Sequence, residues 1–209
     1  YYFLNLLSMY KNTSAQQILS AKNNPLKNIS LLNPFECIEY LVALENSNCA
    51  SKETGWQPMH FYKSKRNKSA FINLYKKNNS HGEFVFDYSW ANAFIRNGLS
   101  YYPKLVSAIP FTPCKSKKVF GDDEISNELI DEIKKMMHDE SINSWHILFP
   151  VNEERKVFLK HDFIERFGYR FVWQNKNFVD FKDYLSIFKS RQRKNIIKER
   201  NSVRSVGIE

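Results

Sequence analysis

The apolar residues of this chain change repeatedly between helical and strand spacing, and this alternation constrains the fold more than any other feature. Asn33, Pro34 and Glu36 combine an N-cap residue, a proline at the first helical position and a glutamate placed to close a capping box, so a helix is predicted to begin there. The later patterns predict strands at 59–62, 70–75 and 83–87, a helix from Trp90 to Asn97-Gly98, a strand at 104–111, a helix at 122–137, a strand at 145–151, a helix at 157–167 closed by Gly168, a strand at 169–174 and a long helix from Phe181. This order predicts an α/β fold with a mixed, largely antiparallel sheet flanked by helices, followed by a long C-terminal basic helix.

The composition sets the class of protein. A chain of 209 residues forms one large domain or two small ones, and 43% hydrophobic residues, with 17 Phe and 11 Tyr, exclude wholesale disorder. No apolar run approaches the roughly 20 residues that span a bilayer, so no transmembrane segment is predicted. The apolar residues 1–7 predict a core strand or a helical turn rather than a signal peptide. Because the chain begins with Tyr1 and stops where a helix gives way to a new strand, we expect a fragment of a longer protein.

The positive charge of the chain is concentrated in one stretch. Lys and Arg total 31 against 22 Asp and Glu, a net charge of +9. Between positions 189 and 204 there are seven basic residues and one acid, Glu199, whereas a solvated helix face normally carries acids in between. This helix is therefore a candidate phosphate-binding element, for tRNA, a nucleotide-linked sugar or an acyl carrier. The residues predicted to bind such a donor are Arg191, Arg193, Lys194 and Lys198.

Several classes of site lack their sequence signatures. Three cysteines, Cys37, Cys49 and Cys114, cannot all pair and show no CxxC spacing, which argues against a disulfide framework or a structural zinc site and favours a reducing cytoplasm. The five histidines form no HxxxH or HExxH pair, so no metal site is predicted. No GxSxG, GxxxxGK[ST] or GxGxxG motif occurs, so hydrolase-elbow, P-loop and dinucleotide-binding chemistry are not indicated.

Two carboxylates stand at the ends of the predicted strand 83–87. Side chains at i and i+4 of a strand share a face, so Glu83 and Asp87 are predicted to project into the same cleft. A carboxylate there can act as a general base and remove a proton from an attacking amine. The alternative is that Asp87 caps the following helix while Glu83 is solvated at the sheet edge. The sequence leaves both interpretations open.

Aromatic residues and prolines bracket the predicted strand 104–111. Tyr101 and Tyr102 precede it, and the sequence Pro-Phe-Thr-Pro occupies 110–113. Aromatic side chains at the mouth of a strand can form a substrate wall, and Lys104 can meet an anionic group. Two tyrosines beside a proline equally often close a core, and the residues alone do not separate the two possibilities.

Several blocks together resemble a known family. GEFVFDYSWA at 82–91, YYPKL at 101–105 and PFTP at 110–113 are the most distinctive, and 33–35, 55–60, 171–175 and 191–194 follow the same order along the chain. This set resembles the bacterial FemAB-like N-acyltransferases, also labelled peptidoglycan biosynthesis/recognition proteins. The resemblance implies two acyltransferase-like (GNAT-type) domains in tandem. Here 33–177 would form the first domain, 178–209 the opening helix of a truncated second one, and 1–32 an N-terminal segment.

The resemblance also implies a reaction. An acyl or aminoacyl group would pass from acyl-CoA or aminoacyl-tRNA to an amine acceptor, with no permanently bound cofactor, and the fragment alone is expected to be inactive. Acetyl-CoA is disfavoured at the junction 87–92, which lacks the glycine-rich turn that cradles a pyrophosphate. A non-catalytic module that recognises tRNA or a peptidoglycan precursor, and a purely structural basic helix, are the competing predictions. With Glu83 and Asp87 as catalytic residues, the predicted substrate contacts are His81, Trp90, Tyr101, Tyr102, Lys104, Thr112, Trp173 and Asn175.

Overall fold

The computed structural model describes residues 7–26, 33–85, 87–169 and 171–208. These residues form two compact units, 1–165 and 166–209, and each is described by itself. Except for Leu7, the apolar opening of the chain lies outside the described residues, so its predicted strand or turn stays a prediction. None of the helices in the described part of the chain is both long and apolar enough to cross a membrane.

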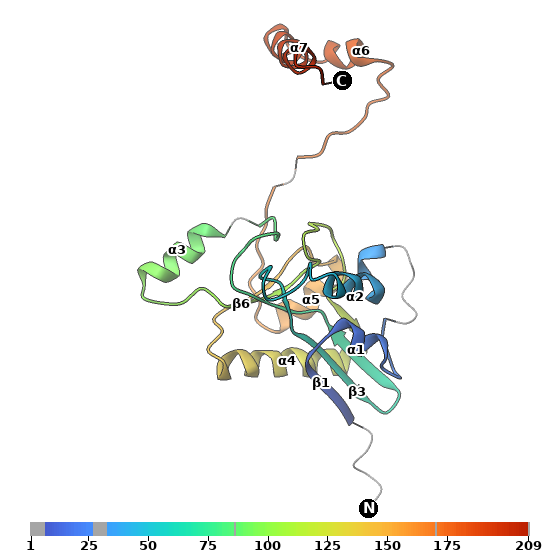
Figure 1. Ribbon diagram of the computed structural model, residues 1–209, viewed down its shortest axis with the longest axis vertical. Helices are drawn as coiled ribbons and strands as arrows, with labels where there is room; N and C mark the ends of the chain where they lie inside the picture. Colours follow the sequence, from blue (N-terminus) through green and yellow to red (C-terminus); the bar gives the residue numbers. More distant parts are fainter. Residues whose placement is uncertain (1–6, 27–32, 86, 170, 209) are drawn as a thin grey trace, which may run out of the picture. The chain divides into compact units, whose positions relative to one another are not determined.

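The first unit contains two four-stranded sheets (Figure 1). The first sheet has the order β1-β3-β4-β7 and is antiparallel throughout: β1 Leu7–Thr13, β3 His60–Lys65, β4 Lys68–Ile72 and β7 Val119–Gly121. The second has the order β2-β5-β6-β8 and ends in a parallel pair: β2 Gln57–Pro58, β5 Tyr75–Lys77, β6 Lys104–Ser107 and β8 Trp145–Ile147. The predicted mixed, mostly antiparallel α/β architecture is confirmed, although it is divided between two sheets rather than formed by one. A GNAT-type topology stays a prediction.

Helices cover both faces of the first sheet. Because strand side chains alternate, Phe61 and Ile72 point to one face, where they pack against α4, and their neighbours Tyr62 and Phe71 point to the other, where they meet α1 and α2. Burial of these faces supplies the core of the unit. The helices of this unit are α1 Ala15–Leu19, a 3-10 turn Pro34–Glu36, α2 Ile38–Asn46, α3 Tyr88–Arg96, α4 Asp123–Asp139 and α5 Asn152–Lys160.

Capping residues begin and end the helices much as the sequence predicts. The Asp122 side chain accepts hydrogen bonds from two backbone N–H groups in the first turn of α4. Asn97 caps the C-terminus of α3, and Gly98 follows it with a positive φ of 71°. Asn33 accepts a hydrogen bond from the Phe35 backbone, but only the short 3-10 turn follows, and α2 begins at Ile38.

The strand predicted at 83–87 is wrong. The described residues of this segment form a loop between β5 and α3, and the backbone has a positive φ at Gly82 (75°) and Phe84 (56°), which an extended strand does not allow. A Cβ at Gly82 would meet the Phe111 ring at 2.5 Å, so the loop is pressed against the segment that follows β6. The two carboxylates therefore owe their positions to a loop and not to strand alternation.

Other predicted boundaries shift for identifiable reasons. The predicted strand 70–75 is split into β4 and β5 by Asn73, whose side chain donates a hydrogen bond to the Ala108 carbonyl, and the strand predicted at 104–111 stops at Ser107. The strand predicted at 145–151 stops at Ile147. The helix predicted at 157–167 is wrong in both bounds: α5 begins at Asn152, with Glu153 and Glu154 in its first turn, and ends at Lys160, so Gly168 does not close it.

The second unit holds α6 Phe181–Ser186 and α7 Ser190–Ser205 (Figure 1). The single long helix predicted from Phe181 is therefore wrong, because Lys189 is extended (ψ 152°) and serves as the N-cap of α7. The strand predicted at 169–174 is also absent among the described residues of that segment, none of which pairs with a neighbouring strand.

Candidate functional site

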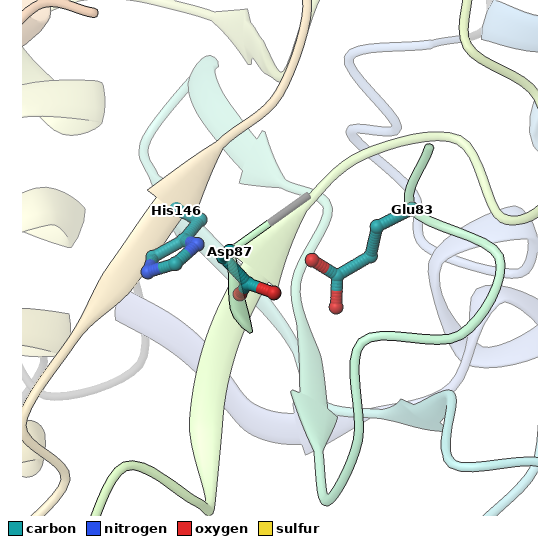
Figure 2. Close-up of side chains that lie close together, drawn as sticks. All are labelled: Glu83, Asp87 and His146. Carbon is teal, nitrogen blue, oxygen red and sulfur yellow. The ribbon is translucent and has the colours of Figure 1, made fainter. Parts of the chain in front are cut away.

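A loop and two strands of the first unit bring titratable side chains together. Glu83 and Asp87 come from the loop that precedes α3, and His146 comes from β8 (Figure 2). One carboxylate oxygen from each acid and one ring nitrogen of His146 all lie within 4.8 Å of one another. The fold thus gathers side chains from positions about 60 residues apart in one place.

The ammonium group of Lys104, at the first position of β6, lies between the two carboxylates. Its Nζ atom donates hydrogen bonds to Asp87 Oδ2 at 2.5 Å, to Glu83 Oε2 at 2.8 Å and to Ser80 Oγ at 2.8 Å. An ammonium group has three N–H donors, so this arrangement uses all of them inside the protein. The side chains of Lys104 and Glu83 are 0% exposed and that of Asp87 is 1% exposed, which makes both ion pairs fully buried.

A second lysine completes the charge balance. Lys77 Nζ lies 4.0 Å from Glu83 Oε1 and 3.7 Å from the centre of the Trp56 ring, and it donates a hydrogen bond to the His81 carbonyl at 2.9 Å. Its side chain is 0% exposed. Two buried ammonium groups therefore face two buried carboxylates. We call Lys77, Glu83, Asp87 and Lys104 the lysine–carboxylate cluster.

Hydroxyl groups connect the cluster to neighbouring aromatic residues. Tyr101 donates a hydrogen bond to Asp87 Oδ2 at 2.6 Å, and Ser80 donates to the same oxygen at 3.0 Å. Tyr102 and Ser80 share a hydrogen bond of 2.7 Å, and the Tyr101 hydroxyl lies 3.4 Å from His146 Nε2. One oxygen of each carboxylate, Glu83 Oε1 and Asp87 Oδ1, is buried and makes no hydrogen bond with the described part of the chain. These two oxygen atoms can therefore each accept a further hydrogen bond.

The surroundings push the two carboxyl pKa values in opposite directions. Burial raises the pKa of Glu83, and the positive charges of Lys104 and Lys77 only partly offset it. Burial also acts to raise the pKa of Asp87, but hydrogen bonds from Lys104, Tyr101 and Ser80 together bring it below its ordinary value. Burial lowers the pKa of Lys77 to about 8 and, together with Asp87, raises the pKa of Tyr101.

Glu83, Asp87 and His146 are residue types that also bind divalent metals. In this structure the Lys104 ammonium lies within 2.8 Å of both carboxylates. A metal ion held by the same oxygens would stand beside that ammonium and be repelled by it. The residues present therefore fit a lysine-centred site better than a metal centre.

The structure brings together some of the predicted site residues and not others. Glu83, Asp87, Tyr101, Tyr102 and Lys104 meet around the cluster. His81 is exposed, and its carbonyl accepts from Lys77 and Trp56. Trp90 is about half exposed on α3, and Thr112 donates to the Pro110 carbonyl in the loop after β6.

The remaining predicted residues belong to the second unit. Trp173 and Asn175 lie in the segment before α6, where Trp173 is 64% exposed. Arg191, Arg193, Lys194 and Lys198 are exposed on α7, and a groove of about 500 Å³ is lined by Lys194, Ile197, Lys198, Asn201, Ser202 and Ser205. Arg200 lies 3.9 Å from the centre of the Phe181 ring, a cation–π contact that joins α7 to α6.

Sequence reasoning missed Lys77, Ser80, His146 and Trp56. The position of Lys77 could have indicated its burial, because it lies two residues after the apolar Tyr75 and hence on the same strand face. Nothing in the local sequence marks Ser80 or His146, since their roles depend on contacts with residues far away in the chain.

Comparison with known proteins tests the resemblance directly. The model of the FemAB-like family, described as peptidoglycan biosynthesis/recognition, matches residues 14–209. This chain belongs to the FemAB-like family. Searches of the curated proteins and of the solved structures give no match. Membership of the FemAB-like family confirms the resemblance drawn from the sequence blocks and links the chain to peptidoglycan biosynthesis.

Proposed function

We propose that this FemAB-like protein is an N-acyltransferase that moves an acyl or aminoacyl group onto an amine of a peptidoglycan precursor, with Glu83 as general base. The observation that carries the proposal is the buried pair of carboxylates, Glu83 and Asp87, held around one ammonium position, with Tyr101 donating to Asp87. These surroundings raise the pKa of Glu83 and lower that of Asp87. Paired groups whose surroundings separate their pKa values in this way are typical of acid–base sites. The family's link to peptidoglycan biosynthesis supports the choice of substrate class.

In this mechanism the acceptor arrives as an ammonium ion, which has no lone pair for attack. Glu83 takes one proton, for which its raised pKa is suited, while Asp87 stays ionised and, with the Tyr101 hydroxyl, holds the nitrogen in place. The neutral amine then attacks the donor carbonyl, so that a C–N bond forms. The ester C–O bond of an aminoacyl-tRNA or the thioester C–S bond of an acyl-CoA breaks, and the second nitrogen proton leaves with the released hydroxyl or thiol.

Both donor classes carry phosphate groups, and the second unit offers the residues that recognise them. Arg191, Arg193, Lys194 and Lys198 are all exposed on α7. Arginine binds phosphate in bidentate fashion and lysine as a point charge. We assign donor binding to this helix. His81, Trp90, Tyr102, Thr112, Trp173 and Asn175 stay proposed substrate contacts.

The test is transfer itself. A purified full-length homologue that carries these residues is mixed with an amine-bearing peptidoglycan precursor and with labelled aminoacyl-tRNA or acyl-CoA, and the product is measured by mass spectrometry. Glu83→Gln should reduce transfer by about 100-fold or more, because general-base catalysis contributes on that order. The matched control is Glu154→Gln, which alters another buried glutamate with a raised pKa, outside the cluster. Full activity of the Glu83 variant would refute the assignment.

A second candidate function rests on the same helix. Between Lys189 and Arg204 the only acid is Glu199, and the basic side chains there are exposed, which suits a module that binds a polyanion without catalysis. Affinity for tRNA or a precursor that falls steeply with salt, without any product, would favour this function over acyl transfer.

A further inference from the structure

The geometry around Lys104 defines the chemistry of what the cluster binds. Three oxygen atoms from Ser80, Glu83 and Asp87 lie 2.5–2.8 Å from a single nitrogen, one for each of its N–H groups. The rings of Tyr101 and Tyr102 lie 5.3 and 5.7 Å from the same nitrogen and offer their π faces to its charge. A quaternary ammonium has no N–H to donate, and a planar guanidinium does not match three acceptors arranged around one nitrogen.

Charge balance adds a second constraint. Lys77 and Lys104 neutralise Glu83 and Asp87, and the four side chains are at most 1% exposed. If Lys104 left without a replacement, a negative charge would stay buried without a partner, which is strongly unfavourable. Exchange of one ammonium group for another keeps the cluster neutral. A second primary ammonium is therefore the species that can replace Lys104 at the least electrostatic cost.

We infer that the lysine–carboxylate cluster is a binding site for primary ammonium groups and that Lys104 is its tethered occupant. Only the identification of the incoming ammonium with the acyl acceptor rests on the proposed function, and the specificity for a primary ammonium rests on the geometry. Lys104 thereby acts as a placeholder, because it satisfies both carboxylates until a substrate amine takes its position. This role also explains how two carboxylates can be kept buried side by side before any acceptor arrives.

The test uses the space that a shortened side chain leaves. Lys104→Ala removes the ammonium and most of its stem, and n-butylammonium is then added as a substitute. The midpoint of unfolding in urea should rise with n-butylammonium and reach a plateau, because a ligand that binds only the folded state stabilises it. Tetramethylammonium at the same ionic strength should give no such rise. The wild type, in which Lys104 competes for the same position, should respond to n-butylammonium only at a much higher concentration. The inference is overturned if both cations raise the unfolding midpoint of Lys104→Ala equally, or if neither of them raises it.

A matched control separates this effect from the general loss of an ion pair. Lys63 is also a largely buried lysine between two carboxylates, since its Nζ lies 2.6 Å from Glu128 and 2.9 Å from Glu132, but those acids are 34% and 26% exposed. Lys63→Ala should show no plateau with n-butylammonium, because its acids stay hydrated. A plateau of similar size in Lys63→Ala would also overturn the inference.

The experiment remains decisive if Lys104→Ala does not fold by itself. Its refolding from urea is then compared with n-butylammonium, with tetramethylammonium and without addition. Recovery with the primary ammonium alone supports the inference, and equal recovery or none in all three overturns it. Because the readout is stability, saturable binding by Lys104→Ala together with no transfer by the full-length homologue would refute the proposed function and leave this inference standing.

Discussion

Replacement of Lys104 by methionine removes one charge from the centre of the cluster and keeps a side chain of similar length. The substitution leaves Glu83 and Asp87 buried with Lys77 as the remaining lysine of the cluster, at 4.0 Å from Glu83 Oε1. Breaking a buried ion pair by removal of one partner typically costs about 3–5 kcal/mol, most of it from the charge left without a partner. We expect the free energy of unfolding of Lys104→Met at neutral pH to fall by about that amount.

The assay is urea unfolding of wild type and variant, with Lys68→Met as the comparison. Lys68 lies 2.9 Å from Asp122 but is 59% exposed, so its loss should change the free energy of unfolding by no more than about 1 kcal/mol. A loss for Lys104→Met as small as that of Lys68→Met would mean that water reaches the cluster. The cluster would then be hydrated, and its carboxylates would not depend on Lys104 for charge balance.

The same variant has a defined pH dependence. Glu83 already has a raised pKa in the folded protein because of burial, and removal of Lys104 takes away a charge that lowers it. Between its unfolded pKa of 4.5 and its higher folded pKa, the folded state binds more protons than the unfolded state, so stability increases as the pH falls. The stability gap between wild type and Lys104→Met should therefore narrow on acidification toward pH ~5, by at most about 1.4 kcal/mol per pH unit for one proton. A gap that widens on acidification would contradict this reasoning.

Three further predictions concern other parts of the chain. Burial lowers the pKa of Lys118 from 10.5 to about 8 in the folded protein. Between these two pKa values the unfolded state binds more protons than the folded state, so stability increases with pH. In urea unfolding, the free energy of unfolding of the wild type should therefore rise relative to that of Lys118→Met by on the order of 1 kcal/mol per pH unit. Gly121→Ala should destabilise the first unit by more than about 1 kcal/mol in the same assay, because φ is +110° and a Cβ would clash with the Ser69 carbonyl. Gly98→Ala, which has open space around it, should lower the free energy of unfolding by less. Lys198→Glu should weaken binding of a labelled RNA oligonucleotide and make its salt dependence shallower by about one unit of slope, as measured by fluorescence anisotropy.

The sequence predicts the elements that depend on local signals. The N-terminus of α4 is predictable because Asp122 is an N-cap residue and acids follow it in the first turn. The C-terminus of α3 is predictable because Asn97-Gly98 is a local stop signal. The loop at 83–87 is missed because a short apolar run between two acids imitates a strand, whereas contacts that include those with Phe111 and Lys104 hold it in another conformation. Tertiary contacts override a short local pattern here.

The site is predictable only in part, for a different reason. The sequence predicts Glu83 and Asp87 in one cleft, and the structure does place them near each other, but they come from a loop and are at most 1% exposed rather than open to a cleft. The alternative is wrong for Glu83, which is not solvated, whereas Asp87 stands at the N-cap of α3 without a side-chain hydrogen bond to the helix. The burial of Lys77 and Lys104 is not predictable from pattern, since lysine is almost never fully buried unless it is paired. The groups that pair with the two lysines come from the loop 80–87. The pairing of β5 with β6 brings the lysines together, with Lys77 directly opposite Lys104.

The three blocks that carry the family resemblance meet at this one place, which gives them a physical explanation. GEFVFDYSWA supplies Glu83 and Asp87, and YYPKL supplies Tyr101 and Lys104, which donate hydrogen bonds to one oxygen of each acid. PFTP supplies Phe111, which packs so closely on Gly82 that no side chain fits there. Each block is incomplete alone, because the carboxylates need the lysine and the loop needs the ring. The most distinctive sequence blocks of this FemAB-like protein therefore contain the residues that bury two carboxylates and an ammonium group.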